Sequence, residues 1–216
     1  MNDEERNEYN LKHIWGSKKG DQWHKLSFER SKNGGFKNLE DRKSLIDGLD
    51  AIVVEQSQFD CIEIGSGNGL FLDYLSKNTN FISYTGLDIS SSIIDVSKKR
   101  YIENKKLNFL NKDPFAYIEN LNVTQNIVIV SCATLQYFME NDLVRLFKAC
   151  KKFNKIYFAI REPINIDLSK EFRSEPRGNI AYSHNYPYLF KNNGYKEEYF
   201  KLNFKSFISK ILSKKN

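Results

Sequence analysis

Short apolar runs alternate with amphipathic segments along most of the chain. Apolar side chains recur at helical spacing over residues 36–55, 68–77, 90–103, 114–120 and 141–152. Short apolar runs, typical of strands, lie at 59–64, 81–87, 107–110, 126–130 and 156–160. The run at 126–130 is wholly apolar after its first residue, as expected for a parallel strand buried on both faces. This alternation predicts an α/β fold, a doubly wound and mostly parallel sheet with helices on both faces.

The length and composition fit one such domain with a short extension. The chain has 216 residues, of which 40% are hydrophobic and 28% are charged. Residues 1–35 are polar, contain both tryptophans and end in Asn33-Gly34-Gly35, a turn signal. We therefore divide the chain into an N-terminal extension, 1–35, and an α/β domain, 36–216.

The chain shows no sign of a membrane span or a secretory leader. No run approaches the roughly 18 apolar residues that a span needs, and the first residues are polar rather than basic and then apolar. Three cysteines, Cys61, Cys132 and Cys150, lack metal-ligand spacing, and we expect reduced thiols in the core. These features predict a cytoplasmic protein.

A glycine-rich loop follows the first predicted strand and reads Glu63-Ile64-Gly65-Ser66-Gly67-Asn68-Gly69. A dinucleotide fingerprint would need glycine or alanine one position later, where Leu70 stands. A carboxylate at Glu63 would repel a pyrophosphate and suits a ligand with a cationic amino group. S-adenosylmethionine (SAM) has such a group, a positive sulfonium and no phosphate. The plainer alternative is a tight turn between strand and helix.

The loop sequence EIGSGNG resembles motif I of the class I SAM-dependent methyltransferases, and the likeness extends over about residues 55–205. The resemblance implies a Rossmann-like sheet that ends in a C-terminal antiparallel hairpin, with residues 195–202 as the first strand of that hairpin. Apolar residues between Phe204 and Leu212 follow helical spacing instead. Because the fold needs a last strand to complete the sheet, we expect a strand there.

The resemblance also implies which residues bind the cofactor. Gly65, Ser66, Gly67 and Gly69 would form the loop beside SAM, with Glu63 preceding it. Asp88 ends the second strand, where an acid accepts hydrogen bonds from the ribose hydroxyls, and Ile89 would offer an apolar face to the adenine. Asp113, followed by Pro114, matches the residue that contacts the adenine amino group, and Ser131 begins the loop beside the methionine end. The alternative for Asp88 and Asp113 is a helix cap.

The segment after the fourth strand points to the class of acceptor. Ser131 to Tyr137 reads S-x-x-x-L-x-Y, which resembles small-molecule enzymes. It is not the [DN]-P-P-[YFW] signature of enzymes that methylate amino groups of bases or glutamine. The acid that metal-dependent catechol-type enzymes use as a ligand is also missing, so we expect no metal.

Residues past the fourth and fifth strands are the candidates for binding and activating the acceptor. We expect Tyr137, Arg161 and Tyr182 to contact it and His184 to remove its proton as a general base, because an imidazole titrates near neutrality. The alternative for His184 is a cap of the following helix. His13 and His24 are rival bases if the extension, which also carries Trp15 and Trp23, closes over the cleft as a lid. Simple packing of these aromatics is the plainer alternative.

These inferences favour a SAM-dependent methyltransferase that acts on a hydroxyl of a small molecule, such as a sugar or nucleotide-linked sugar. The net charge of +6 and pI of about 9.0 leave an RNA methyltransferase as an alternative. A second alternative is a SAM-binding scaffold without catalysis. The oligomeric state is not indicated by the sequence.

Overall fold

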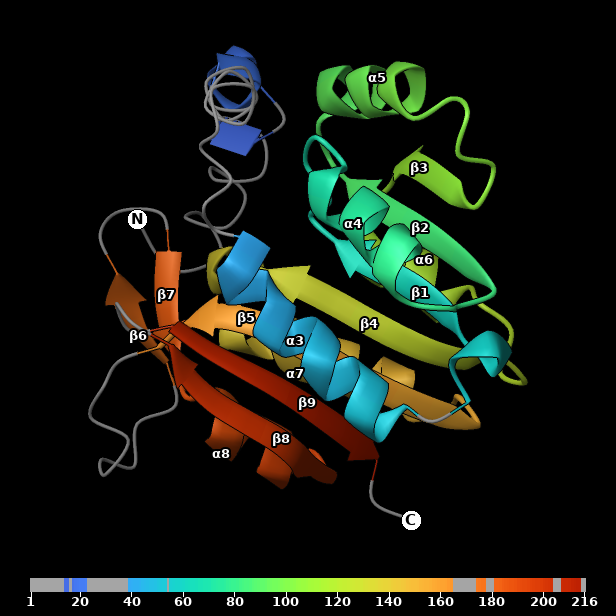
Figure 1. Cartoon of the computed structure of the whole chain (residues 1–216). Helices are drawn as coiled ribbons and strands as arrows, with labels where there is room; N and C mark the ends of the chain where they lie inside the picture. The colour runs from blue at the N-terminus through green and yellow to red at the C-terminus, as the bar shows by residue number, and fades with distance from the viewer. Residues whose placement is uncertain are drawn as a thin grey trace.

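The computed structural model describes residues 14–15, 17–22, 39–53, 55–164, 174–177, 181–203 and 207–214. It contains a seven-stranded sheet with the order β3-β2-β1-β4-β5-β9-β8 (Figure 1). Its strands are β1 (Asp60–Ile64), β2 (Ser83–Asp88), β3 (Leu107–Asn111), β4 (Asn126–Cys132), β5 (Lys155–Pro163), β8 (Tyr195–Asn203) and β9 (Phe207–Lys214). Strands β1 to β5 pair in parallel, and β9 pairs antiparallel with both β5 and β8. The predicted fold class, with its C-terminal antiparallel hairpin, is confirmed.

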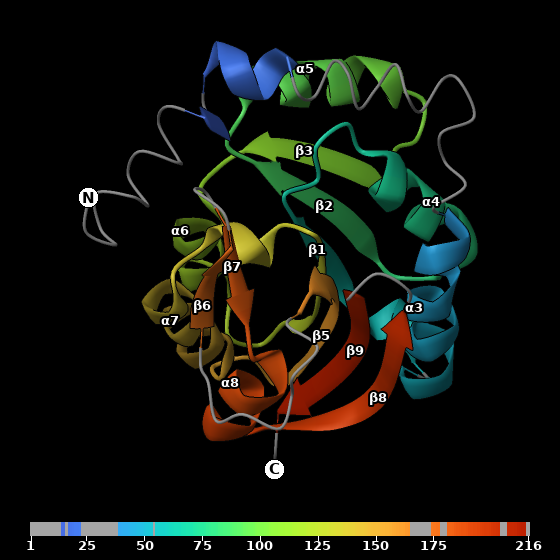
Figure 2. The same ribbon diagram turned by 90° about the vertical axis from the view of Figure 1, so that its left-hand side faces the viewer.

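Helices lie between the parallel strands, close to where the periodicity places them. They are α3 (Leu39–Ile52), α4 (Leu70–Asn78), α5 (Ser91–Arg100), α6 (Pro114–Glu119), α7 (Glu140–Cys150) and α8 (Tyr186–Asn192), with 3-10 turns η2 (Gln56–Gln58) and η3 (Leu135–Tyr137). In Figure 2, α6, α7 and α8 lie on one side of the sheet and α3 and α4 on the other. The sheet is therefore covered on both faces.

Alternate residues of the central strands feed two separate cores. Ile127 and Ile129 of β4 pack with the layer of α6, α7 and α8, whereas Val128 and Val130 pack with α3 and α4. All four side chains are fully buried. Because successive strand residues point to opposite faces, an uninterrupted apolar run is what a strand between two helical layers requires.

The C-terminal segment forms a strand, although its apolar residues follow helical spacing. Residues 207–214 form β9, which lies between β5 and β8 and pairs with β5 from Tyr157 opposite Ser213 to Pro163 opposite Phe207. Two neighbouring strands satisfy its backbone groups, and this outweighs the spacing of the apolar side chains. Phe204 lies outside the described residues.

A small hairpin lies between β5 and α8 along the chain. Strand β6 (Ser174–Arg177) pairs antiparallel with β7 (Ala181–His184), which leads directly into α8. The hairpin is a separate two-stranded sheet. Among the described residues, no helix has the length and apolarity needed to cross a bilayer.

Candidate functional site

The glycine loop after β1 lies between the end of β2 and the segment that follows β4. The backbone N–H groups of Gly65 and Ser66 both donate to the carbonyl of Leu87, at 2.8 and 3.0 Å. Positive φ angles occur at Gly65 (71°), Gly67 (51°) and Gly69 (73°). A Cβ atom at Gly65 would also collide with the side chain of Thr134. Glycine is therefore required at position 65 by both backbone conformation and space.

Asp88 ends β2 and is bonded to the glycine loop. Its Oδ2 accepts from the Gly67 N–H at 2.9 Å, and its Oδ1 accepts from the Ser90 N–H at 2.9 Å. The N-cap of α5 is Ser90, whose hydroxyl accepts from the Ile93 N–H. The alternative in which Asp88 caps α5 is therefore wrong. Asp88 as a residue is 9% exposed, and its role as ribose ligand stays a prediction.

The other predicted cofactor residues lie around the same end of the sheet. Glu63 is 3% exposed near the end of β1, and Ile89, next to Asp88, is partly exposed. Ser66 is buried with its side chain against Gly86. These positions fit the expected cleft, and their contacts with a cofactor stay predictions.

Asp113 and Pro114 have a clear local role. Asp113 is the N-cap of α6, and its Oδ1 accepts from the Ala116 N–H at 2.8 Å, while Pro114 occupies the first turn. The structure therefore contains the helix cap that was the alternative for Asp113. The contact of Asp113 with adenine stays a prediction, and it would have to use the side-chain oxygen that does not cap the helix.

Ser131 is fully buried at the end of β4, and its hydroxyl donates to Glu162 Oε1 at 2.6 Å. The same oxygen accepts from the backbone N–H groups of Thr134 and Leu135, at 3.0 and 3.1 Å. Burial raises the pKa of Glu162 to about 7, although these hydrogen bonds lower it. The hydroxyl of Ser131 is thus committed to a carboxylate rather than directed at the cofactor.

Sequence reasoning missed Glu162. The available signal was an acid at the end of the fifth apolar run, in Arg161-Glu162-Pro163. Arg161, one residue earlier, is 9% exposed, and its carbonyl accepts from the Ala133 N–H at 2.9 Å. Arg161 therefore lies at the expected end of the sheet, and its contact with an acceptor stays a prediction.

His184 does not have the surroundings of a general base. Its ring is fully buried, with Nε2 3.1 Å from the Phe138 carbonyl and Nδ1 2.7 Å from the Ser174 hydroxyl. A carbonyl only accepts, so Nε2 donates, and the neutral ring then accepts at Nδ1. Burial lowers the pKa of His184 to about 4. This geometry argues against the predicted base role and indicates a structural one.

The alternative in which His184 caps the following helix is wrong. The N-cap of α8 is Asn185, whose Oδ1 accepts from the Tyr188 N–H at 3.1 Å. Tyr182, predicted to contact the acceptor, is 6% exposed and stacks on His184 with ring centroids 5.6 Å apart. Through its bond to the Phe138 carbonyl, His184 joins the β6–β7 hairpin to the domain.

Two described residues of the N-terminal segment contact the parts of the chain that follow β4 and β2. Trp15 packs on Tyr137, the residue after β4 predicted to contact the acceptor, with ring centroids 4.6 Å apart. Asp21 accepts hydrogen bonds from the hydroxyls of Ser90, at 3.2 Å, and Ser92 at the start of α5. Figure 2 shows this segment beside α5. These contacts fit a lid, which stays a proposal, and His13, Trp23 and His24 lie outside the described residues.

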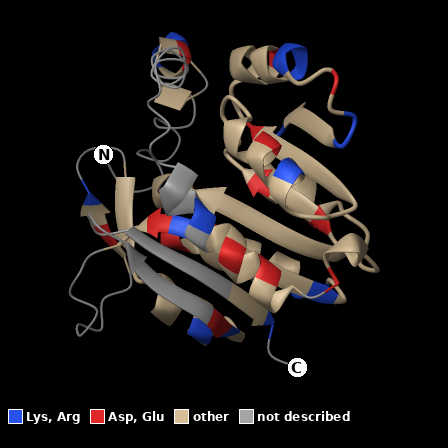
Figure 3. Cartoon of the chain, in the orientation of Figure 1, with Lys and Arg blue, Asp and Glu red and all other residues tan. Residues whose placement is uncertain are grey.

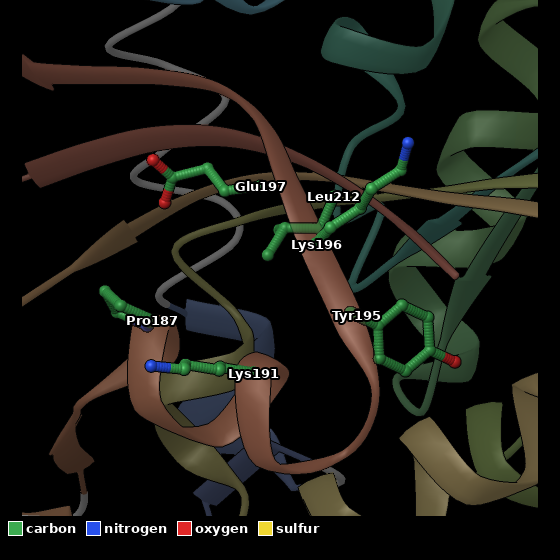
Figure 4. A pocket seen from close by; sticks show the side chains of 6 residues that line it. All are labelled: Pro187, Lys191, Tyr195, Lys196, Glu197 and Leu212. Carbon is green, nitrogen blue, oxygen red and sulfur yellow. The ribbon is translucent and has the colours of Figure 1, made fainter. Parts of the chain in front are cut away.

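A pocket of about 340 Å³ lies at the opposite end of the sheet (Figure 4). It is lined by Pro187, Lys191, Tyr195, Lys196, Glu197 and Leu212. Leu212 pairs with Phe158 in the first half of β5, and Tyr195 begins β8. The pocket is therefore remote from the glycine loop and is not the candidate site.

Comparison with known proteins gives a family match over part of the chain. Residues 62–155 match a family model described as a methyltransferase domain. Over 139 residues the chain is 29% identical to malonyl-[acyl-carrier protein] O-methyltransferase 1 of Ilyobacter polytropus. This match covers 57% of the chain and 50% of the relative, so the chain spans about half the length of the curated relative it matches.

Solved structures show the same fold at low sequence identity. A SAM-dependent methyltransferase from Clostridium acetobutylicum has a TM-score of 0.62 at 14% identity, over 90% of this chain and 99% of that one. Magnesium protoporphyrin IX methyltransferase from Synechocystis, with bound S-adenosylhomocysteine (SAH), has 0.63 at 14% identity, over 92% and 94%. The [4+2]-cyclase SpnF has 0.61 at 9% identity, over 80% of each chain. The class I fold is confirmed, and the cyclase shows that this fold alone does not define a reaction.

Proposed function

We propose that this chain, whose fold is that of class I SAM-dependent methyltransferases, transfers a methyl group from SAM to an oxygen of a small molecule. The observation that supports the proposal most is the unit formed by the glycine loop and Asp88 at the carboxyl ends of β1 and β2. Parallel α/β sheets bind ligands at this edge. The family match covers the loop and Asp88.

The residues present fit SAM better than a dinucleotide. The Gly67 N–H, which could otherwise hold a phosphate, already donates to Asp88. Two buried or nearly buried acids, Glu63 and Asp88, lie beside the loop. Negative charge here repels a pyrophosphate and favours a ligand with cationic groups. Asp88 would hold the ribose hydroxyls, the glycine loop the amino acid portion, and Ile89 the adenine.

When bound, SAM supplies a methyl group on a positive sulfonium, which is already a good leaving group. The protein then mainly has to position an oxygen in line with that methyl group and exclude water. Tyr137 ends the 3-10 turn that follows β4, and Arg161 lies near the end of β5. An acceptor would stand there, and Trp15 would cover it. These assignments follow from position in the fold.

A hydroxyl acceptor, such as a sugar, is the expected substrate, and it would need a base to take its proton. The burial and full hydrogen bonding of His184 favour a second candidate, a carboxylate acceptor, which is already ionised at neutral pH. The O-methyltransferase relative acts on malonyl-[acyl-carrier protein], an acyl substrate. Both candidates are O-methylation.

RNA is a weaker candidate. Figure 3 shows Lys and Arg interspersed with Asp and Glu on the described elements, without a continuous basic face in that view. A nucleic-acid enzyme concentrates positive charge around its site and binds with strong salt dependence. The experiment that identifies the acceptor also tests whether the protein is a scaffold without catalysis.

The test is incubation of the protein with methyl-labelled SAM and three sets of acceptors: sugars and nucleotide sugars, carboxylic acids and acyl thioesters, and RNA. Label in a small molecule, together with formation of SAH, supports the proposal and assigns the acceptor class. Label in RNA alone would overturn the small-molecule assignment. SAH binding without turnover on any set would favour the scaffold.

A further inference from the structure

The turn after β4 is strained and connects several parts of the site. Ala133 has φ of 58°, which residues with a Cβ atom rarely adopt. The next residue, Thr134, lies against Gly65 of the glycine loop. Gln136 accepts from Arg177 of β6 at 2.7 Å, and Tyr137 packs on Trp15. A strained backbone persists only where its surroundings hold it, and such strain gathers at functional sites.

Glu162 is hydrogen-bonded to the backbone of this turn. Its Oε1 accepts three hydrogen bonds, from the Ser131 hydroxyl and the N–H groups of Thr134 and Leu135. The carboxyl is fully buried, and its Oε2 lacks a hydrogen-bond partner, as does the buried hydroxyl of Tyr186. Burying a carboxyl with one oxygen unpartnered costs free energy. Bracing a turn does not by itself explain why a carboxyl stands here. An amide of the same size would also brace it, without carrying charge.

We infer that Glu162 is a positioning residue for methyl transfer, whose ionised carboxylate fixes the strained turn at 133–137. Through Thr134 the turn sets the place of the glycine loop, and through Tyr137 it sets the wall of the acceptor site. The inference rests on the proposed function. Glu162 would control cofactor affinity without contacting the cofactor, and it would make that affinity depend on pH.

The charge of Glu162 changes near neutral pH, whereas its described neighbours keep theirs. Burial raises the pKa of Glu162 to about 7. Burial, and then the Glu162 charge, raise the pKa of Tyr137 and of Tyr186, while the cation of Arg177 lowers both. Burial lowers the pKa of His184 to about 4, so it is neutral above pH 6. Among these described groups, Glu162 alone titrates between about pH 6 and 8.5.

The first test needs no ligand. Amide resonances of Thr134 and Leu135 are followed by NMR from pH 6 to 8.5 in the wild type, in Glu162→Gln and in Glu119→Gln, which alters an exposed carboxylate on α6. We expect both amides to titrate with a midpoint near 7 in the wild type and in Glu119→Gln, and to be flat in Glu162→Gln. Titration that persists in Glu162→Gln would overturn the inference.

The second test measures SAH affinity over the same pH range. Wild type should bind SAH about fivefold more weakly at pH 6 than at pH 8.5, the difference between charge-assisted and neutral hydrogen bonds. Glu162→Gln should stay at the weaker value throughout. If it matches the wild type at every pH, Glu162 only braces the fold and the inference fails. Failure of the wild type to bind SAH would instead sink the proposed function, while the amide titration still judges Glu162.

Ser131→Ala provides an independent variant if Glu162→Gln does not fold. The Ser131 hydroxyl bond lowers the pKa of Glu162. Removing it should move the midpoint of both the amide titration and the SAH affinity to higher pH. A midpoint unchanged in Ser131→Ala would contradict the inference, because the titrating group would then not be the carboxyl that Ser131 contacts.

Discussion

The Oδ2 atom of Asp88 accepts a hydrogen bond of 2.9 Å from the backbone N–H of Gly67. The acid that ends β2 and the glycine loop that follows β1 are therefore one hydrogen-bonded unit. An N–H group already bonded to a carboxylate is a poor site for a phosphate. Because of this contact, we expect the loop to bind SAM rather than a dinucleotide.

Asp88→Asn keeps the size of the side chain and one acceptor oxygen but removes the charge. We expect SAM affinity to fall by about 1.5–3 kcal/mol, the usual range for hydrogen bonds to a charged group. Helix α5 should stay folded because Ser90 caps it. Calorimetry and thermal melting measure the two effects. Unchanged affinity with a lower melting temperature would show that Asp88 only braces the glycine loop.

Gly65→Ala should abolish measurable SAM binding. The added Cβ atom would meet Thr134, and φ of 71° disfavours any residue but glycine. Gly194→Ala is the matched control, because Gly194 has φ of 79° but lies in the turn between α8 and β8. Both variants should lose stability, and Gly194→Ala alone should keep wild-type affinity when assayed below its melting temperature. Normal binding by Gly65→Ala would place the cofactor elsewhere.

The elements of the sheet could be predicted from the sequence because each depends on local patterns. The apolar run at 126–130 lies within β4, and the loop ending at Gly69 leads into α4. The candidate site is harder to predict from the sequence, because its hydrogen bonds join residues that are far apart along the chain. Glu162 meets Ser131 across 31 positions and His184 meets Phe138 across 46, which no spacing reveals. The residue type of His184 and its neighbours in sequence predict a base, whereas its burial in the folded domain favours a structural role.

His184→Gln should destabilise the domain without affecting SAM affinity. The imidazole makes two buried hydrogen bonds, and losing each costs roughly 1–3 kcal/mol when a partner is left unsatisfied. Chemical denaturation at pH 7 measures this loss. A variant of normal stability whose turnover falls by about 10² or more would restore the role of general base.

Glu162 and His184 should change stability with pH in opposite directions. The folded pKa of Glu162, about 7, is above its ordinary value of 4.5, so its contribution is lost as pH rises from 4.5 to 7. The folded pKa of His184, about 4, is below its ordinary 6.5, so its contribution is lost as pH falls from 6.5 to 4. Each contribution amounts to about 3 kcal/mol, and the two nearly cancel between pH 4.5 and 6.5.

Single variants separate these contributions. Glu162→Gln should gain stability as pH rises from 4.5 to 6.5, because only the histidine contribution remains. His184→Gln should lose stability as pH rises from 4.5 to 7. Urea denaturation at several pH values gives both slopes. Parallel profiles for the two variants would show that one of these groups does not have the shifted pKa described above.

The most direct test of the account is titration calorimetry of the wild-type chain with SAM, SAH and NAD. The glycine loop bonded to Asp88, with Leu70 where a dinucleotide fingerprint needs glycine or alanine, predicts clear binding of SAM and SAH and weak or absent binding of NAD. Micromolar binding of NAD without binding of SAM or SAH would contradict the central claim.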